Sequence, residues 1–196
     1  KGGDISYAGC GLPYYIGGDI PARENLIVNT PAKYAGLTGA EVCTGCEATG
    51  IDSVNKTVTV KKASGETFTE SYDKLIIATG AQPFIPPVDG VQLAGVFCVR
   101  TPDDATSTRT YIEENQCRKA VVCGAGFIGL EVAENLLAQG LEVTVIDAAS
   151  QIMPNAFDAE MADYAKKQLK AAGMRVLTAT SLKAIEGTNK AEKVIT

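Results

Sequence analysis

The chain has 196 residues, 45% of them hydrophobic and 21% charged, which supplies enough apolar side chains for one or two globular domains. Its 18 basic and 23 acidic residues leave a net charge of −5, and no basic cluster exceeds a pair, which argues against a nucleic-acid surface. No apolar run reaches membrane length and no signal-peptide pattern is present, so we expect a soluble, cytoplasmic protein.

The cysteines and the missing histidine restrict the chemistry further. Without a histidine the chain cannot build a Ser-His-Asp or Cys-His apparatus or a His-based metal site from its own residues. The six cysteines lack the density and spacing of a secreted disulfide scaffold.

The first 40 residues are rich in Gly, Pro and Asn and predict loops with one or two short helices, one of them starting at Thr30-Pro31. They include "ISYAGCGLPYY" (5–15), which sets Cys10 between two glycines. Cys10 could be a small buried side chain, half of a disulfide or a nucleophile. Tyr15 stands where a C-x-x-x-x-C pair would have its second thiol, so any partner sulfur would have to come from a substrate.

Residues 42–79 favour β structure. Two alternating segments, 56–62 and 67–72, flank the turn residues 63–66 and predict a hairpin. The continuous apolar run in 73–80 predicts a strand buried on both faces. Three prolines and a glycine in 81–90 exclude regular structure, so we interpret this segment as a crossover between two domains.

From Thr101 onward, strands and helices alternate. Pro102-Asp103-Asp104 predicts the first turn of a helix running to about Glu114. The expected elements that follow are a buried strand at 119–126, a helix at 127–140, a strand at 141–147, a helix at 157–173, a strand at 174–178 and a closing hairpin. This order predicts a parallel α/β layer.

Between the first of these strands and its helix, Gly124-Ala125-Gly126-Phe127-Ile128-Gly129 has the pattern G-x-G-x-x-G. Gly124 would allow the tight turn, Gly126 would let the backbone approach a pyrophosphate, and Gly129 would let helix and strand pack closely. The N–H groups at the start of the helix favour phosphate. The alternative is a nucleotide-free βαβ unit whose glycines serve packing alone.

The next strand ends at Asp147, 18 residues after the last glycine of the motif. Its carboxylate can accept hydrogen bonds from the ribose hydroxyls of a dinucleotide. Ala148, Ala149 and Ser150 offer no positive charge to a 2′-phosphate, which favours NADH over NADPH. The alternative is an acid that merely ends a strand.

Three segments, "GCGLPYY", "YDKLIIATGAQPFIPP" and "VVCGAGFIGLEVAENLLAQGLEVTVID", in this order, resemble the pyridine nucleotide-disulfide oxidoreductases. Within that superfamily the chain is similar to the single-cysteine branch: coenzyme A disulfide reductases, NADH-dependent persulfide reductases, and NADH oxidases and peroxidases. The resemblance implies FAD and NADH as cofactors and Rossmann-like, doubly wound α/β sheets. It also implies a partial FAD-binding domain over 1–101 and a partial NAD-binding domain over 102–196.

The resemblance carries site residues over by position. Cys10 matches the redox cysteine that faces the flavin, while Ser6 and Gly9 match substrate-binding positions, Gly9 standing where relatives often have asparagine. The other matches fall on two cofactor sites. They are Cys10, Pro13, Thr79 and Gly80 for FAD, and Gly124, Gly126, Phe127, Ile128, Gly129, Glu131 and Asp147 for NAD.

The resemblance implies an electron path from NADH through FAD to Cys10 and then to coenzyme A disulfide, persulfide or polysulfide. A second possibility is an NADH oxidase or peroxidase in which Cys10 cycles through sulfenic acid. A third is an NAD-binding or redox-sensing module without catalysis. We expect a piece of a larger, homodimeric enzyme that lacks both ends, and therefore binds FAD poorly and is inactive by itself.

Cys43-Thr44-Gly45-Cys46 has the spacing C-x-x-C, but no second pair follows and no histidine is available. The segment favours a β edge, so we interpret these cysteines as incidental and expect no metal site. Cys98, Cys117 and Cys123 are expected to pack at the ends of strands and helices.

Overall fold

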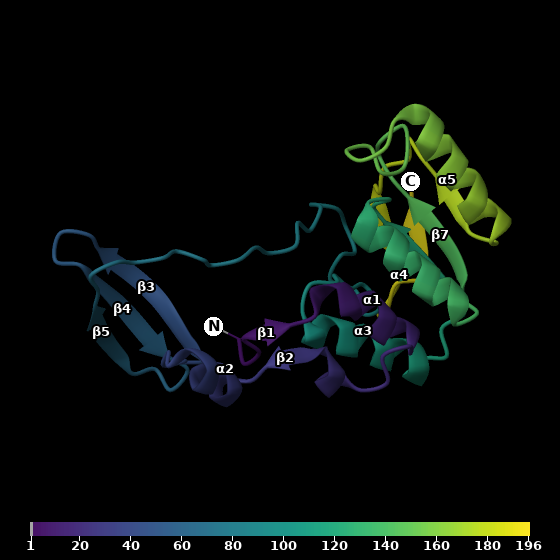
Figure 1. The fold of residues 1–196 in the computed structure, drawn as a ribbon. Helices are drawn as coiled ribbons and strands as arrows, with labels where there is room; N and C mark the ends of the chain where they lie inside the picture. Colours follow the sequence, from purple (N-terminus) through teal and green to yellow (C-terminus); the bar gives the residue numbers. More distant parts are fainter. Residues whose placement is uncertain (1) are drawn as a thin grey trace. The chain divides into compact units, whose positions relative to one another are not determined.

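The computed structural model describes residues 2–196, which form two compact units (Figure 1). The first unit contains the described residues up to Ala8 together with Ile27–Ala81, and the second contains Gly9–Leu26 and Gln82–Thr196. The predicted domain boundary at residue 101 stays a prediction. It divides the chain according to which cofactor each part binds, whereas these two units are defined by contacts between residues.

The first unit is mainly antiparallel β structure. Strand β1 (Ser6–Tyr7) pairs with β2 (Ile27–Asn29), and β3 (Cys46–Asp52), β4 (Thr57–Lys62) and β5 (Thr67–Ser71) form a sheet in that order. The β4–β5 pair is the expected hairpin. Helix α2 (Pro31–Thr38) begins at Thr30, whose hydroxyl accepts a hydrogen bond from the backbone N–H of Lys33 at 3.3 Å, so the predicted cap is confirmed.

The apolar run at 73–80 does not form the predicted buried strand. Ile76 is 87% exposed and Ile77 is 69% exposed. A buried strand needs neighbours that pair with its N–H and C=O groups, and no strand among residues 2–196 pairs with this run. Hydrophobicity alone therefore did not determine its structure. The following segment, 81–90, contains no helix or strand, as expected.

The second unit contains the predicted parallel layer. Strands β6 (Lys119–Cys123), β7 (Glu142–Ile146) and β8 (Arg175–Leu177) lie in that order, connected by helices α4 (Phe127–Ala138) and α5 (Ala159–Ala171). The central strand β7 buries Val143 and Val145 almost completely. Strand β6 was expected to be buried but has a strand on one side alone, and Val121 on it remains 43% exposed.

The helix predicted after Thr101, the acids in its first turn and the final hairpin are also present in the second unit. Helix α3 (Pro102–Glu114) begins with a capping box in which the Thr101 hydroxyl accepts from the Asp104 N–H at 3.2 Å and the Asp104 carboxylate accepts from the Thr101 N–H at 2.8 Å. Asp103 and Asp104 are thus first-turn acids. Strands β9 (Ala184–Glu186) and β10 (Lys193–Ile195) form the expected final hairpin.

Residues 9–26 also belong to the second unit. They form the 3-10 helix η1 (Gly9–Gly11), helix α1 (Leu12–Gly17) and the 3-10 helix η2 (Arg23–Leu26). Leu12, Tyr15 and Ile16 of α1 are buried, and α1 packs against both α3 and α4 (Figure 1). The Cys10 segment is therefore built onto the same unit as the parallel sheet.

Candidate functional site: the glycine turn and the Cys10 segment

The turn between β6 and α4 has the geometry that its three glycines predict. Gly124 has φ +108°, a conformation that L side chains rarely adopt. A Cβ on Gly129 would collide with the carbonyl oxygen of Gly124, so this glycine permits the close approach of helix and strand. A Cβ on Gly126 would meet nothing within 4 Å, so the backbone there is open.

Asp147 at the end of β7 is hydrogen-bonded to this turn. Its Oδ2 accepts a hydrogen bond from the backbone N–H of Ala125 at 2.6 Å, and its Oδ1 accepts from that of Ala149 at 2.7 Å. A carboxylate has about four lone-pair positions, so two remain for a ligand. Asp147 therefore holds the glycine turn in addition to its predicted role toward ribose, a contact that the motif alone did not indicate.

The remaining residues predicted to bind NAD lie in the first turns of α4. Phe127 and Ile128 are 64% and 61% exposed, and Glu131 is half-buried. The structure thus brings the predicted NAD residues together: 124–131 are continuous, and Asp147 reaches them through Ala125. The open backbone at Gly126, with the free N–H groups that begin α4, fits a dinucleotide pyrophosphate.

Cys10 is exposed in η1, directly before α1. A Cβ on Gly9 would meet nothing within 4 Å, so there is space on that side of the thiol. Pro13 lies buried in the first turn of α1. Cys10 is neither a buried side chain nor, in this structure, half of a disulfide.

The other three predicted site residues lie in the first unit. Ser6 is half-buried in β1, while Thr79 and Gly80 are exposed and Gly80 has φ +73°. These residues belong to a different unit from Cys10 and the glycine turn, and their substrate and FAD roles stay predictions.

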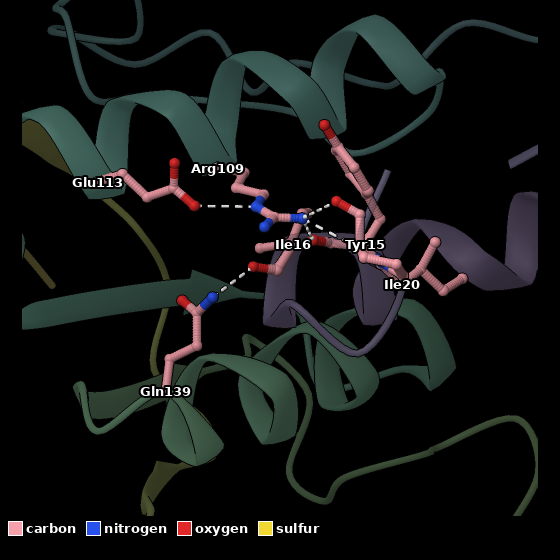
Figure 2. A network of polar contacts seen from close by, with 7 residues as sticks. Tyr15, Ile16, Ile20, Arg109, Glu113 and Gln139 are labelled. Atoms are coloured by element: carbon pink, nitrogen blue, oxygen red, sulfur yellow. Dashed lines mark hydrogen bonds and ion pairs between the residues drawn. The ribbon is translucent and has the colours of Figure 1, made fainter. Parts of the chain in front are cut away.

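Two side chains that sequence reasoning missed hold the end of α1 (Figure 2). Arg109 of α3 donates through Nη1 to the carbonyl oxygens of Tyr15 and Ile20 at 3.2 Å and of Pro21 at 3.3 Å. Gln139 donates through Nε2 to the carbonyl oxygen of Ile16 at 2.7 Å. The last carbonyls of a helix have no partner within the helix, and Arg109 and Gln139 supply donors there; the Tyr15 carbonyl also accepts from the Gly18 N–H at 3.2 Å.

The guanidinium of Arg109 is fixed by two further contacts. It lies 4.9 Å from the centroid of the Tyr15 ring, and its Nε donates to Glu113 Oε1 at 2.9 Å. Cation–π attraction and a charge-assisted hydrogen bond therefore restrict its orientation. We call Arg109 and Gln139, with the carbonyls they bind, the α1 clamp.

All six cysteines are free thiols. Cys123, at the end of β6, is exposed rather than packed as expected, and partial desolvation raises the pKa of its thiol. Within residues 2–196, no three Cys, Asp or Glu side chains gather in a way that could hold a metal ion. In the same residues, no helix combines the length and the hydrophobicity needed to cross a membrane.

The parallel strands, the glycine turn and Asp147 define a Rossmann-type dinucleotide-binding protein, which confirms the predicted fold class. The family assignment is equally specific. Residues 1–196 match the pyridine nucleotide-disulphide oxidoreductases, and the chain belongs to this family. The predicted cofactors, FAD and NADH, agree with solved neighbours in this family, of which one is described as FAD-dependent and one is bound to NADH.

Three relatives show the range of the resemblance. An NADH oxidase of Methanocaldococcus jannaschii is 40% identical over 97% of this chain and 43% of its own length. A coenzyme A disulfide reductase of Staphylococcus haemolyticus is 37% identical over 78% of this chain and 34% of its own. The solved structure of an NAD-dependent persulfide reductase from A. fulgidus is 37% identical, with a TM-score of 0.91 over 98% of this chain and 36% of that one. The chain thus spans less than half of each.

Proposed function

We propose that this chain is part of an FAD-dependent, NADH-driven reductase of coenzyme A disulfide, persulfide or polysulfide that works through Cys10. The observation that carries the proposal is the exposed thiol between two glycines, with Tyr15 in place of a second cysteine. A single exposed thiol suits an enzyme whose substrate brings the other sulfur. The reductase names of two relatives support the same substrate class.

In this proposal the thiolate of Cys10 attacks one sulfur of the substrate, and the S–S bond breaks. A mixed disulfide forms on Cys10 and the other half leaves as a thiolate. Two electrons and a proton then release the second thiol and restore Cys10. FAD, when bound, relays these two electrons from NADH.

The chain's own residues divide between binding and orientation. The backbone at Gly126 and the start of α4 hold the NADH pyrophosphate, and Asp147 accepts from the ribose hydroxyls. Phe127, Ile128 and Glu131 line the nicotinamide side. Pro13, Thr79 and Gly80 contact FAD, and Ser6 and Gly9 contact the coenzyme A-type substrate. The full-length enzyme is a homodimer.

The test replaces Cys10 with serine in the full-length enzyme. We expect NADH to reduce the flavin at an unchanged rate while disulfide and persulfide reduction fall to background, because the variant lacks the sulfur that accepts the electrons. Cys98→Ser is the matched control and should retain both activities. Reductase activity in Cys10→Ser close to that of the control contradicts the proposal.

A second candidate function is favoured by the NADH oxidase of Methanocaldococcus jannaschii. There Cys10 would be oxidised to sulfenic acid by peroxide and reduced again through the flavin, releasing water. Steady-state NADH consumption with coenzyme A disulfide, persulfide, peroxide and oxygen separates the two functions. Turnover with peroxide or oxygen, combined with trapping of a sulfenic acid at Cys10 and no turnover with disulfide, would establish the oxidase.

A further inference from the structure

The segment Cys43-Thr44-Gly45-Cys46 matches the expected β edge at its last residue, where the edge strand β3 begins. Thr44 and Gly45 form a turn, and β3 begins at Cys46. Gly45, the third residue of this turn, has φ +66°, as a type II turn requires at that position. The two cysteines are therefore the first and last residues of a β-turn.

A β-turn changes what the two thiols can do. In an extended strand, residues three apart are separated by about 10 Å, too far for a disulfide. The Cα atoms at the two ends of a β-turn lie within about 7 Å, and disulfides form at Cα separations of roughly 4.4–6.8 Å. The turn thus places Cys43 and Cys46 at the separation that a disulfide needs.

The turn is fixed by the sheet next to it. The carbonyl oxygen of Gly45 accepts a hydrogen bond from the N–H of Ala63 at 2.9 Å, and Cys46 lies opposite Lys62 in the β3–β4 register. Cys43 is exposed and Cys46 is half-buried. Both thiols are therefore held on an ordered support, and at least one is accessible to a small molecule.

We propose that Cys43 and Cys46 form a redox-active pair, independent of Cys10, that exchanges with small-molecule disulfides. One cysteine thiolate attacks a disulfide RSSR, forms a mixed disulfide and releases one RSH after protonation. The second cysteine then attacks the protein sulfur of the mixed disulfide and releases the second RSH. The net reaction converts the protein dithiol and RSSR into a protein disulfide and two RSH, so the protein loses two protons and two electrons.

Glu41 lowers the reactivity of Cys43. Partial desolvation and the nearby Glu41 carboxylate raise the pKa of Cys43, whose Sγ lies 3.8 Å from Glu41 Oε1. A thiol with a raised pKa provides less thiolate at neutral pH, so Cys43 reacts more slowly than it would without this carboxylate. Replacing Glu41 with glutamine should therefore speed formation of the 43–46 disulfide.

The test treats the purified, reduced 196-residue chain with glutathione disulfide and follows it by intact-mass spectrometry and tryptic mapping. The peptide of residues 34–56 contains Cys43 and Cys46 and no other cysteine. We expect this peptide to become lighter by two hydrogens and to retain no glutathione. Cys43→Ser and Cys46→Ser should each retain one glutathione instead, and Cys98→Ser is the matched control that closes like the unmodified chain.

Three outcomes would overturn the proposal: stable glutathione on the peptide of the unmodified chain, no oxidation of this peptide, or disulfide-linked dimers in place of the internal bond. Cys10→Ser separates this proposal from the proposed reductase. Formation of the 43–46 disulfide in Cys10→Ser supports the redox-active pair whether or not the reductase proposal holds. Loss of closure in that variant would show that the pair depends on Cys10 and would refute its independence.

Discussion

Arg109→Ala should loosen the helix that follows Cys10. Arg109 donates to the carbonyl oxygens of three residues at the end of α1 and beyond it. Truncation leaves the carbonyls of Ile20 and Pro21 without this donor, while that of Tyr15 keeps the Gly18 N–H alone. The Arg109 side chain is 23% exposed, so water can reach part of the vacated space. The free energy of locally unfolding α1 should therefore fall, with a smaller effect on the parallel sheet.

The size of the effect follows from the contacts that are lost. Nη1 carries two hydrogens shared among three acceptors, which we count as two charge-assisted bonds. Such bonds contribute about 1.5–3 kcal/mol each, but partial access of water reduces their sum to about 2–4 kcal/mol. The cation–π contact with the Tyr15 ring contributes about 0.5–1 kcal/mol and is counted inside this sum. About 1.4 kcal/mol corresponds to a tenfold change in the equilibrium constant for local unfolding. Amide exchange in α1 should therefore accelerate about 30- to 800-fold.

Hydrogen–deuterium exchange measured by mass spectrometry on peptides covering 12–20 tests this value. The hairpin β4–β5 in the first unit serves as an internal reference and should be unchanged. Gln139→Ala removes one neutral hydrogen bond, worth about 0.5–1.5 kcal/mol, and should accelerate α1 exchange about 2- to 12-fold.

Glu113→Ala is the matched control. It removes the exposed ion pair with Arg109 but leaves the carbonyl contacts in place. The free energy of locally unfolding α1 should therefore fall by at most about 0.5 kcal/mol, which accelerates its amide exchange roughly twofold. Equal exchange in α1 of Arg109→Ala and Glu113→Ala would refute the reasoning, because the carbonyl contacts would then contribute nothing measurable.

Three further outcomes can be checked. Replacing Asp147 with alanine and Ala148 with arginine should shift the preference from NADH toward NADPH, measured as the ratio of the two dissociation constants, whereas Asp147→Asn should weaken both. Gly90→Ala should lower the unfolding temperature of the second unit, because Gly90 has φ +88° and a Cβ there would collide with the carbonyl oxygen of Ile185; an unchanged temperature would contradict the structure. Hydrogen bonds from Asn55, with a smaller one from Val54, hold the pKa of Asp52 below its ordinary value. The β3–β4 turn should therefore be most stable above the ordinary aspartate range and lose that contribution as the pH falls through the lowered pKa, which NMR titration of Asp52 can follow.

The local sequence was sufficient to predict those elements whose structure depends on residues close together in the chain. The order of strand, glycine turn and helix from 119 to 140 predicted β6, α4 and the separate roles of Gly124 and Gly129, because each depends on residues nearby in the chain. The cap at Thr30 and the hairpin β4–β5 were predicted for the same reason.

The contacts that hold α1 could not be predicted this way. Arg109 and Tyr15 are 94 positions apart, and Gln139 and Ile16 are 123 apart, so no local pattern indicates either contact. The run at 73–80 shows the opposite case. Its apolar residues predicted a buried strand, but burial depends on pairing partners that the run itself does not encode.

The packing of α1 also limits how chains of this family can be recombined. A cut at the apparent boundary near Thr101 would separate α3 and α4 from Leu12, Tyr15 and Ile16, and leave on those helices an apolar surface now covered by α1. It would also leave Arg109 and Gln139 without the carbonyls they bind. A chimera that exchanges the dinucleotide half of this chain for that of a relative should therefore transfer residues 9–26 with it, so that Cys10 is inherited together with the helices that pack against α1.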